Sequence, residues 1–293
     1  MNKFYEAVIV SASRRTDIPA FYSEWFFERL REGFALVRNP VNPLQIRRVA
    51  LDPGGIDCIV FWTKNPGPML PALGKLEDYH YYFQFTLNAY GEDVEPGLPR
   101  KEGVIDTFKA LSEKLGPRRL IWRYDPILIN ESYTLPWHIE KFGETARALK
   151  GRAERVTLSF IDFYAKTARN TEGLKIREMS REEKAGIAGE LSRIAGENGL
   201  SVSACAEDID LSPWGIGRAK CIDDKLIERI SGRPLDVKKD RSQRPACGCV
   251  SSADIGAYNT CPHGCRYCYA NHSDAAVVKN AQNHDPLSPL LAG

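Results

Sequence analysis

The stretch DCIVFWTKNP, residues 57–66, runs from an apolar segment directly into a lysine, an asparagine and a proline. Its apolar part lacks the alternation of polar and apolar residues that marks a half-exposed strand. Near-continuous apolar runs of this length are typical of parallel sheets, whose strands are buried on both faces. The stretch therefore predicts a buried parallel strand that ends in polar side chains.

Seven other segments repeat this pattern of a β-rich apolar run followed by polar residues. They are AVIVSAS (7–13), FALVRNP (34–40), YYFQFTLN (81–88), RLIWRYDP (119–126), RVTLSFIDFY (155–164), LSVSACAED (200–208) and SADIGAYNT (252–260). Amphipathic stretches separate most of them, and in one, Ser180 with Glu183 predicts a capping box and Gly199 a helix end. The weakest unit is the second, because NPLQIRRVALDPGG contains several Pro and Gly residues.

Eight alternating strand–helix units predict an α/β fold, either a (β/α)8 barrel or a partial TIM-like barrel, with a doubly wound open sheet as the alternative. We expect a single barrel-like domain over residues 1–293. In it, the cysteine-rich segment 236–284 completes the barrel at the C-terminus, and residues 285–293, DPLSPLLAG, form a loose tail.

The overall composition fits a globular protein without a membrane partner. Hydrophobic residues make up 43% and charged residues 27%, and the net charge is only +2, so a basic patch would have to be local. No apolar run reaches the length of a membrane-spanning helix, and the N-terminal residues lack the features of a signal peptide. We expect a cytoplasmic protein, in which eight cysteines point to metal or redox chemistry rather than disulfides.

Charged side chains follow several predicted strands directly. In a barrel of this kind the carboxyl ends of the strands form one functional face. Long cations at that face favour an anionic ligand even when the whole protein is nearly neutral. The predicted ligand-contacting residues there are Arg14, Arg38, Lys64, Arg123 and Asp125.

The segment NTCPHGCRYCYANHS, residues 259–273, contains three cysteines spaced C-x3-C-x2-C. A structural zinc site needs four ligands, and His272 is the nearest candidate for the fourth. Three thiolates are alternatively what a [4Fe–4S] cluster uses when one iron stays open to an outside ligand. The residue types alone leave both metals possible.

CPHGCRYC resembles the C-x3-C-x-aromatic-C motif of the radical S-adenosylmethionine (SAM) superfamily, with Tyr267 in the aromatic position. The run CRYCYA resembles spore photoproduct lyase and, more closely, an uncharacterised bacterial family that carries this loop at its C-terminus. The resemblance implies that Cys261, Cys265 and Cys268 bind a [4Fe–4S] cluster whose fourth iron takes S-adenosylmethionine. It also implies that Tyr267 lies near the adenine, and that flavodoxin or ferredoxin donates the electron.

The chain departs from this superfamily in two respects. The motif normally follows the first strand of the barrel, whereas here it follows the last, which suggests a circular permutation with the last strand beside the first. A Gly-Gly-Glu element that normally holds the methionine amino group is missing. In the permuted order SASRRTD (11–17) takes its place, so Ser13, Thr16 and Asp17 are candidates to bind SAM, together with Lys64.

Five further cysteines lie outside this motif. Cys58 falls within a predicted buried strand and is expected to be an inert core residue. Cys205, Cys221, Cys247 and Cys249 are a possible second metal site, either an auxiliary Fe–S cluster or zinc bound by four thiolates. One objection is that Cys247 and Cys249 precede their strand, which would place them at the opposite end of the barrel from Cys205.

The leading hypothesis is a radical SAM enzyme that generates a 5′-deoxyadenosyl radical and acts on an anionic small molecule or nucleotide. Two alternatives are a zinc- or Fe–S-stabilised nucleic-acid-binding protein and a DNA-repair lyase. The basic run KKDRSQR (238–244) has no interleaved aromatic residues and is expected to be a solvated connector, so nucleic acid is not favoured as a partner.

Overall fold

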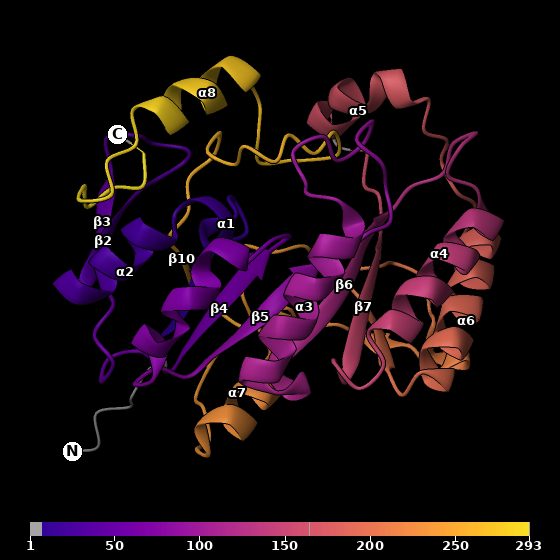
Figure 1. The fold of residues 1–293 in the computed structure, drawn as a ribbon, viewed down its shortest axis with the longest axis horizontal. Helices are drawn as coiled ribbons and strands as arrows, with labels where there is room; N and C mark the ends of the chain where they lie inside the picture. Colours follow the sequence, from indigo (N-terminus) through magenta and orange to yellow (C-terminus); the bar gives the residue numbers. More distant parts are fainter. Residues whose placement is uncertain (1–7, 164, 293) are drawn as a thin grey trace.

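The computed structural model describes residues 8–163 and 165–292, with only the backbone described at residues 165, 166 and 168. Its centre is a parallel sheet of eight strands in the order β10-β1-β4-β5-β6-β7-β8-β9 (Figure 1). The strands are β1 (Ile9–Ala12), β4 (Cys58–Thr63), β5 (Tyr81–Thr86), β6 (Leu120–Ile127), β7 (Arg155–Phe160), β8 (Ser201–Ala204), β9 (Gly217–Arg218) and β10 (Ala253–Asp254). The predicted α/β class with a large parallel sheet is confirmed, while closure into a barrel stays a prediction.

The last strand lies directly beside the first. β10 pairs with β1 in parallel, with Val10 opposite Ala253 and Ser11 opposite Asp254. The Asp254 carboxylate also accepts hydrogen bonds from the hydroxyls of Ser11 (2.7 Å) and Ser13 (2.8 Å). This is the adjacency that the permuted order requires, although the two strands are separated by almost the whole chain.

The second predicted strand is not part of this sheet. β2 (Phe34–Arg38) pairs antiparallel with β3 (Ile46–Ala50) in a separate hairpin. The Asn39 side chain accepts hydrogen bonds from the backbone of Val41 and Asn42, so the proline-rich connection turns the chain back immediately. The expectation of a parallel strand over residues 34–40 is therefore wrong, and the short strand β9 was not predicted.

Helices pack on both faces of the large sheet, with the longest of them on the face of the main core. The helical elements are α1 (Ile18–Phe21), α2 (Ser23–Glu32), η1 (Gly67–Leu76), α3 (Lys101–Leu115), η2 (Pro117–Arg119), α4 (Leu135–Ala148), α5 (Ala165–Thr171), η3 (Glu172–Leu174), α6 (Arg181–Glu197), η4 (Ser212–Trp214), α7 (Asp224–Ser231) and α8 (Asp274–Gln282). The predicted capping box of Ser180 and Glu183 is present at the start of α6. In the described residues, no helix combines the length and apolar character needed to cross a membrane.

Alternate residues of the strands separate two apolar clusters. Phe61 and Phe83 point to the main core, which contains the apolar faces of α2, α3, α4 and α6. Val60 and Tyr82 point to the other face, where they meet Ile222, residues of α7 and the segment after α7. This second face, covered by α7 and an irregular segment, contains Cys221, Cys247 and Cys249.

The C-terminal residues up to Ala292 are held against the hairpin rather than loose. The carbonyl of Pro289 accepts a hydrogen bond from Leu36 of β2 (2.8 Å), and the indole of Trp25 donates to the carbonyl of Ser288 (2.9 Å). Leu291 is buried. The loose tail expected over 285–293 is thus corrected for 285–292, because backbone carbonyls of the segment accept hydrogen bonds from α2 and β2 and Leu291 is buried in the main core. The ends of three predicted segments, Ala7, Tyr164 and Gly293, lie outside the described residues.

Candidate metal and cofactor site

The cysteine loop, defined as residues 259–271, follows β10 and lies at the carboxyl ends of the strands (Figure 1). The backbone N–H of Gly97 donates to the carbonyl of His263 (2.9 Å), and that of Arg266 donates to the carbonyl of Val94 (2.9 Å). The Tyr269 hydroxyl donates to the carbonyl of Arg14 (2.6 Å). The loop is therefore fixed to the segments that follow β5 and β1.

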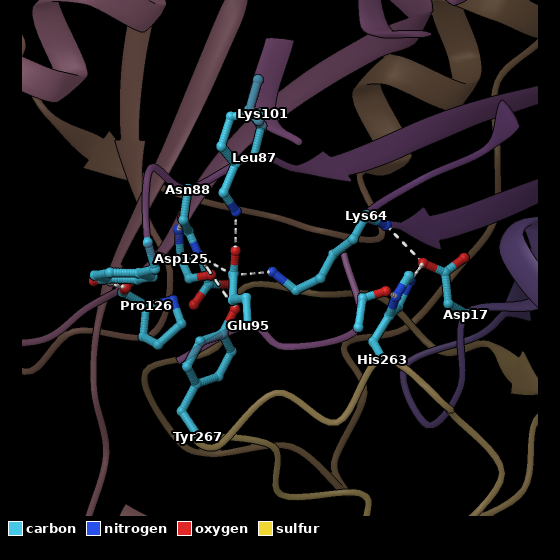
Figure 2. A network of polar contacts seen from close by, with 12 residues as sticks. Asp17, Lys64, Leu87, Asn88, Glu95, Lys101, Asp125, Pro126, His263 and Tyr267 are labelled. Atoms are coloured by element: carbon cyan, nitrogen blue, oxygen red, sulfur yellow. Dashed lines mark hydrogen bonds and ion pairs between the residues drawn. The ribbon is translucent and has the colours of Figure 1, made fainter. Parts of the chain in front are cut away.

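Glu95 is the centre of the polar network beneath this loop (Figure 2). Its fully buried carboxylate pairs with the ammonium groups of Lys64, at 2.8 Å, and Lys101. It also accepts hydrogen bonds from the hydroxyl of Tyr267 and from the amide of Asn88, at 3.2 Å. Although burial acts in the opposite direction, Lys64 and Lys101 lower the pKa of Glu95 to about 2. Two cations for one carboxylate leave the network with a net positive charge next to the thiols.

Tyr267 and Lys64 therefore lie together, as the sequence predicted for two cofactor-binding residues. The Lys64 ammonium is 5.2 Å from the centre of the Tyr267 ring, a cation–π distance. Burial opposes the protonated form of Lys64, but Glu95 and Cys265 favour it more strongly, so its pKa is raised. Lys64 remains a cation at the base of the cysteine loop.

Asp17 joins the ends of two strands to the same loop. One carboxylate oxygen contacts Nε2 of His263 at 2.9 Å and accepts the backbone N–H of Lys64 at 2.7 Å. The other oxygen accepts the N–H of Ala20 and thereby caps α1. This explains why Asp17 is buried at the end of β1, but as placed it is fully occupied with protein partners.

The other two candidates after β1 differ in what their side chains contact. The Ser13 hydroxyl donates to Asp254 and accepts the N–H of Arg15 (2.9 Å), so it holds β1 to β10. The hydroxyl of Thr16 is buried and has no hydrogen-bond partner in the protein. The same is true of one terminal nitrogen of Arg14. A buried polar atom without a partner is costly unless a ligand satisfies it. Thr16 and Arg14 therefore fit a polar ligand better than Ser13 does.

The three cysteines of the cysteine loop are half-buried. Burial raises the pKa of Cys261 and Cys268, and it raises that of Cys265 to about 12 despite the nearby Lys64 ammonium. The backbone N–H of Ala270 donates to the sulfur of Cys268 (3.4 Å). Metal binding would release the thiol protons, and the resulting thiolates would be stabilised by this N–H and by Lys64. The chemistry of the donors fits an Fe–S cluster.

The predicted anion-binding residues do not all meet at this end of the sheet. Arg123 is buried and pairs with Asp125, and Arg14 lies over the ring of Trp62 at 5.2 Å. Arg38 instead lies in the β2–β3 hairpin, where it donates to the carbonyl of Pro43 (2.9 Å). Its assignment to the mouth of the sheet depended on the parallel strand that the structure does not contain, and it is withdrawn.

The four-cysteine group, Cys205, Cys221, Cys247 and Cys249, gathers on the sheet face opposite the main core. The sulfurs of Cys205 and Cys221 are 3.6 Å apart, and Cys249 interacts with the thiols of both Cys221 and Cys247. A hydrogen bond with Cys221 and the Arg123 guanidinium, against the effect of burial, lower the pKa of Cys205 to about 7. The expected inert residue Cys58 is fully buried in β4. Within the described residues, no three His, Cys, Asp or Glu side chains already converge as a metal site.

Sequence reasoning missed Glu95, Lys101 and Asp254. Glu95 lies in the polar connection between β5 and α3 and Lys101 is the first residue of α3, and charged residues at such positions are ordinarily solvated. The local signal was Glu95-Pro96-Gly97, where a carboxylate precedes two residues that fix a turn. Asp254 lies inside an apolar run, and an aspartate at such a position needs buried partners.

Comparison with known proteins adds a family but no activity. A family model described as "Domain of unknown function (DUF1848)" matches residues 9–270. The match begins at the first residue of β1 and includes all three cysteines of the loop. No curated protein matches the chain.

Proposed function

We propose that this chain, which belongs to the DUF1848 family, is a radical SAM enzyme that acts on an anionic substrate. In this proposal Cys261, Cys265 and Cys268 hold a [4Fe–4S] cluster. The observation that carries it is the position of the three-thiol loop, at the carboxyl ends of a parallel sheet and on the strand that pairs with β1. Three thiolates leave one iron free for an outside ligand, which is the requirement for binding S-adenosylmethionine.

When bound, the cluster would supply one electron to the sulfonium of SAM, which breaks the C5′–S bond and releases methionine and a 5′-deoxyadenosyl radical that takes a hydrogen atom from the substrate. An external one-electron donor such as flavodoxin or ferredoxin would provide that electron. The protein's own contribution is to bind and orient the reactants, and to exclude water from them.

The network around Glu95 suits a cluster-binding role, because it holds the cysteine loop in place and offsets the negative charge of the cluster with its thiolates. Three thiolates on a cluster core of charge +2 have a net charge of −1. The excess positive charge of Lys64 and Lys101 over Glu95 lies next to Cys265 and offsets it. Glu95 also holds the hydroxyl of Tyr267, and so orients the aromatic ring that the family resemblance assigns to the adenine.

Arg14 is the best candidate for the anionic group of SAM or of the substrate. It is the predicted cation with a buried nitrogen that lacks a protein partner. Its ion pair with Asp240 is long, at 3.8 Å, whereas Arg123 is engaged by Asp125. Thr16, two residues on, offers a buried hydroxyl in the same segment. These two unsatisfied groups support a polar ligand between β1 and the loop.

The test is anaerobic reconstitution with iron and sulfide, followed by reduction in the presence of SAM. We expect about four irons per chain and formation of 5′-deoxyadenosine. The Cys261→Ala/Cys265→Ala/Cys268→Ala variant should lose both, whereas Cys58→Ala, which alters a buried cysteine far from the loop, should keep both. Stoichiometric zinc without iron at the loop would contradict the proposal and favour a structural role.

A further inference from the structure

We propose that the four-cysteine group binds one zinc ion and thereby joins the two edges of the parallel sheet. Nothing in this proposal depends on the radical SAM function, because none of its ligands belongs to the cysteine loop.

The four residues come from segments at opposite edges of the sheet. Cys205 directly follows β8, and Cys221 follows β9, the last strand on that side. Cys247 and Cys249 precede β10, the last strand on the other side. The long connection between β9 and β10 crosses the open face and brings them together, which removes the objection that they precede their strand. One metal ion bound by all four cysteines would connect the segments next to the two edge strands, β9 and β10, which do not pair with each other.

The distance between the sulfurs of Cys205 and Cys221 matches a single metal ion rather than a cluster or a disulfide. At a Zn–S distance of about 2.3 Å, tetrahedral geometry places two sulfurs about 3.8 Å apart. The sulfurs of Cys205 and Cys221 are 3.6 Å apart. A disulfide would require about 2.0 Å. In a four-iron cluster each thiolate binds a different iron, so the sulfurs would be farther apart.

Cys221 is held in place by its backbone as well as by its thiol. Its carbonyl accepts hydrogen bonds from the hydroxyl of Tyr82 (2.7 Å) and from the side-chain amide of Gln84 (2.9 Å), both on β5. Its sulfur accepts a hydrogen bond from Arg123 at 2.8 Å. The backbone N–H of Ile222 donates to the sulfur of Cys249 at 3.4 Å. Such donors to sulfur are the outer contacts that metal-bound thiolates use.

Charge is the second argument for a metal with four thiolate ligands. A zinc ion with four thiolates has a net charge of −2, which is costly to bury without cations nearby. The buried Arg123 guanidinium donates to the sulfur of Cys221, and Cys249 and Cys221, against the effect of burial, raise the pKa of the half-buried Arg14. Neither Cys58 nor the cysteines of the loop have an arginine hydrogen-bonded to their sulfur among the described contacts.

The thiol contacts are pairwise, from Cys205 to Cys221, from Cys221 to Cys249 and from Cys249 to Cys247, rather than directed at one point. A cysteine side chain has one rotatable bond before its sulfur, with three staggered rotamers. In this proposal the outer members, Cys205 and Cys247, change rotamer when zinc binds, so that the four sulfurs converge on one ion. Four protein ligands leave no open position, which is the arrangement of a structural zinc site.

The experiment measures metal in the Cys261→Ala/Cys265→Ala/Cys268→Ala variant, purified with zinc and iron both available. We expect about one zinc per chain, with X-ray absorption showing four sulfur neighbours at about 2.3 Å. Cys221→Ser and Cys249→Ser should each lose the zinc, while Cys58→Ser keeps it. If a serine variant fails to fold, the X-ray absorption spectrum of the Cys261→Ala/Cys265→Ala/Cys268→Ala variant, whose four-cysteine group is intact, still shows whether zinc is bound by four sulfurs.

Three results would overturn the proposal: iron instead of zinc in the loop variant, no metal at all, or a Cys205–Cys221 disulfide detected by peptide mass spectrometry. Each is distinct from failure of the proposed function, which is read from iron bound by the loop and from 5′-deoxyadenosine. A protein with zinc in the four-cysteine group but no iron in the loop would support this proposal and contradict the other.

Discussion

The two groups of cysteines differ in how sequence and structure define them. The cysteine loop has its three thiols within one short segment, and its spacing points to a cofactor before any contact is known. The four-cysteine group is scattered over residues 205–249, and only the fold brings its sulfurs within contact. A site whose ligands are close in sequence can therefore be recognised from the sequence. A site whose ligands are dispersed can be recognised only once the fold is known.

The largest effect on stability should come from the four-cysteine group. Zinc that binds only the folded chain stabilises it by about 4 kcal/mol when its free concentration is a thousand times Kd. Chelation of zinc should therefore lower the unfolding midpoint of the Cys261→Ala/Cys265→Ala/Cys268→Ala variant, measured by chemical denaturation. An unchanged midpoint after verified loss of zinc would contradict this prediction, because it would show that zinc in the four-cysteine group does not stabilise the fold.

The next effect concerns the network that supports the loop. Glu95→Gln leaves Lys64 and Lys101 without their buried carboxylate, and we expect a loss of about 3 kcal/mol in the free energy of unfolding at neutral pH. Glu92→Gln, an exposed position on the same loop, is the matched control and should change little. Equal effects of the two substitutions would mean that the network does not hold the loop.

Acidic pH should remove the stabilisation that the ion pairs of Glu95 with Lys64 and Lys101 provide. The pKa of Glu95 is lowered from 4.5 to about 2, so the folded state disfavours its protonation. The stabilisation is present above pH 4.5 and is lost as the pH falls toward 2. The stability difference between the unsubstituted protein and Glu95→Gln should therefore shrink over that range. A difference that stays constant from pH 5 to about 2 would contradict the assigned pairing.

A smaller effect is expected for the hydroxyl of Tyr267. Tyr267→Phe removes one donor to a charged acceptor but keeps the ring, so the loss should be about 2 kcal/mol. Iron content should remain at the level of the unsubstituted chain, because the cysteines are unchanged. A complete loss of iron in this variant would show that Tyr267 does more than position the loop.

The smallest effect is expected at Arg38, which the structure separates from both groups. Arg38→Ala removes a surface hydrogen bond to the Pro43 carbonyl and should change stability by less than about 0.5 kcal/mol. Formation of 5′-deoxyadenosine should be unaffected, whereas Arg14→Ala should reduce it. A strong effect of Arg38→Ala on SAM cleavage would restore the residue to the site from which the hairpin excludes it.

The parts of the fold that could be predicted are those with strong local patterns. Continuous apolar runs identified seven of the strands in the large sheet, because burial on both faces leaves a clear composition signal. The run 34–38 carries the same signal but belongs to a hairpin, since the turn at Asn39 acts through side-chain contacts. Two-residue β9 has no periodicity to detect.

For the candidate site, the sequence identified several of the residues but not the buried residue that they contact. It placed Tyr267, Lys64 and Asp17 in one region, and the structure brings all three to the cysteine loop. It could not identify Glu95 as the acceptor for Tyr267 and Lys64, because burial of this loop carboxylate depends on ion pairs with Lys64, which is distant in sequence, and with Lys101 at the start of α3. Pairing of that kind is a tertiary property, as is the contact between Cys205 and Cys221.

The central claim is that the cysteine loop holds a [4Fe–4S] cluster with one iron open to S-adenosylmethionine. Electron paramagnetic resonance of the anaerobically reconstituted and reduced chain tests it most directly, with and without SAM. We expect a reduced [4Fe–4S] signal that changes when SAM is added and that is absent from the Cys261→Ala/Cys265→Ala/Cys268→Ala variant. A signal that persists in that variant, or one that SAM leaves unchanged, would contradict it.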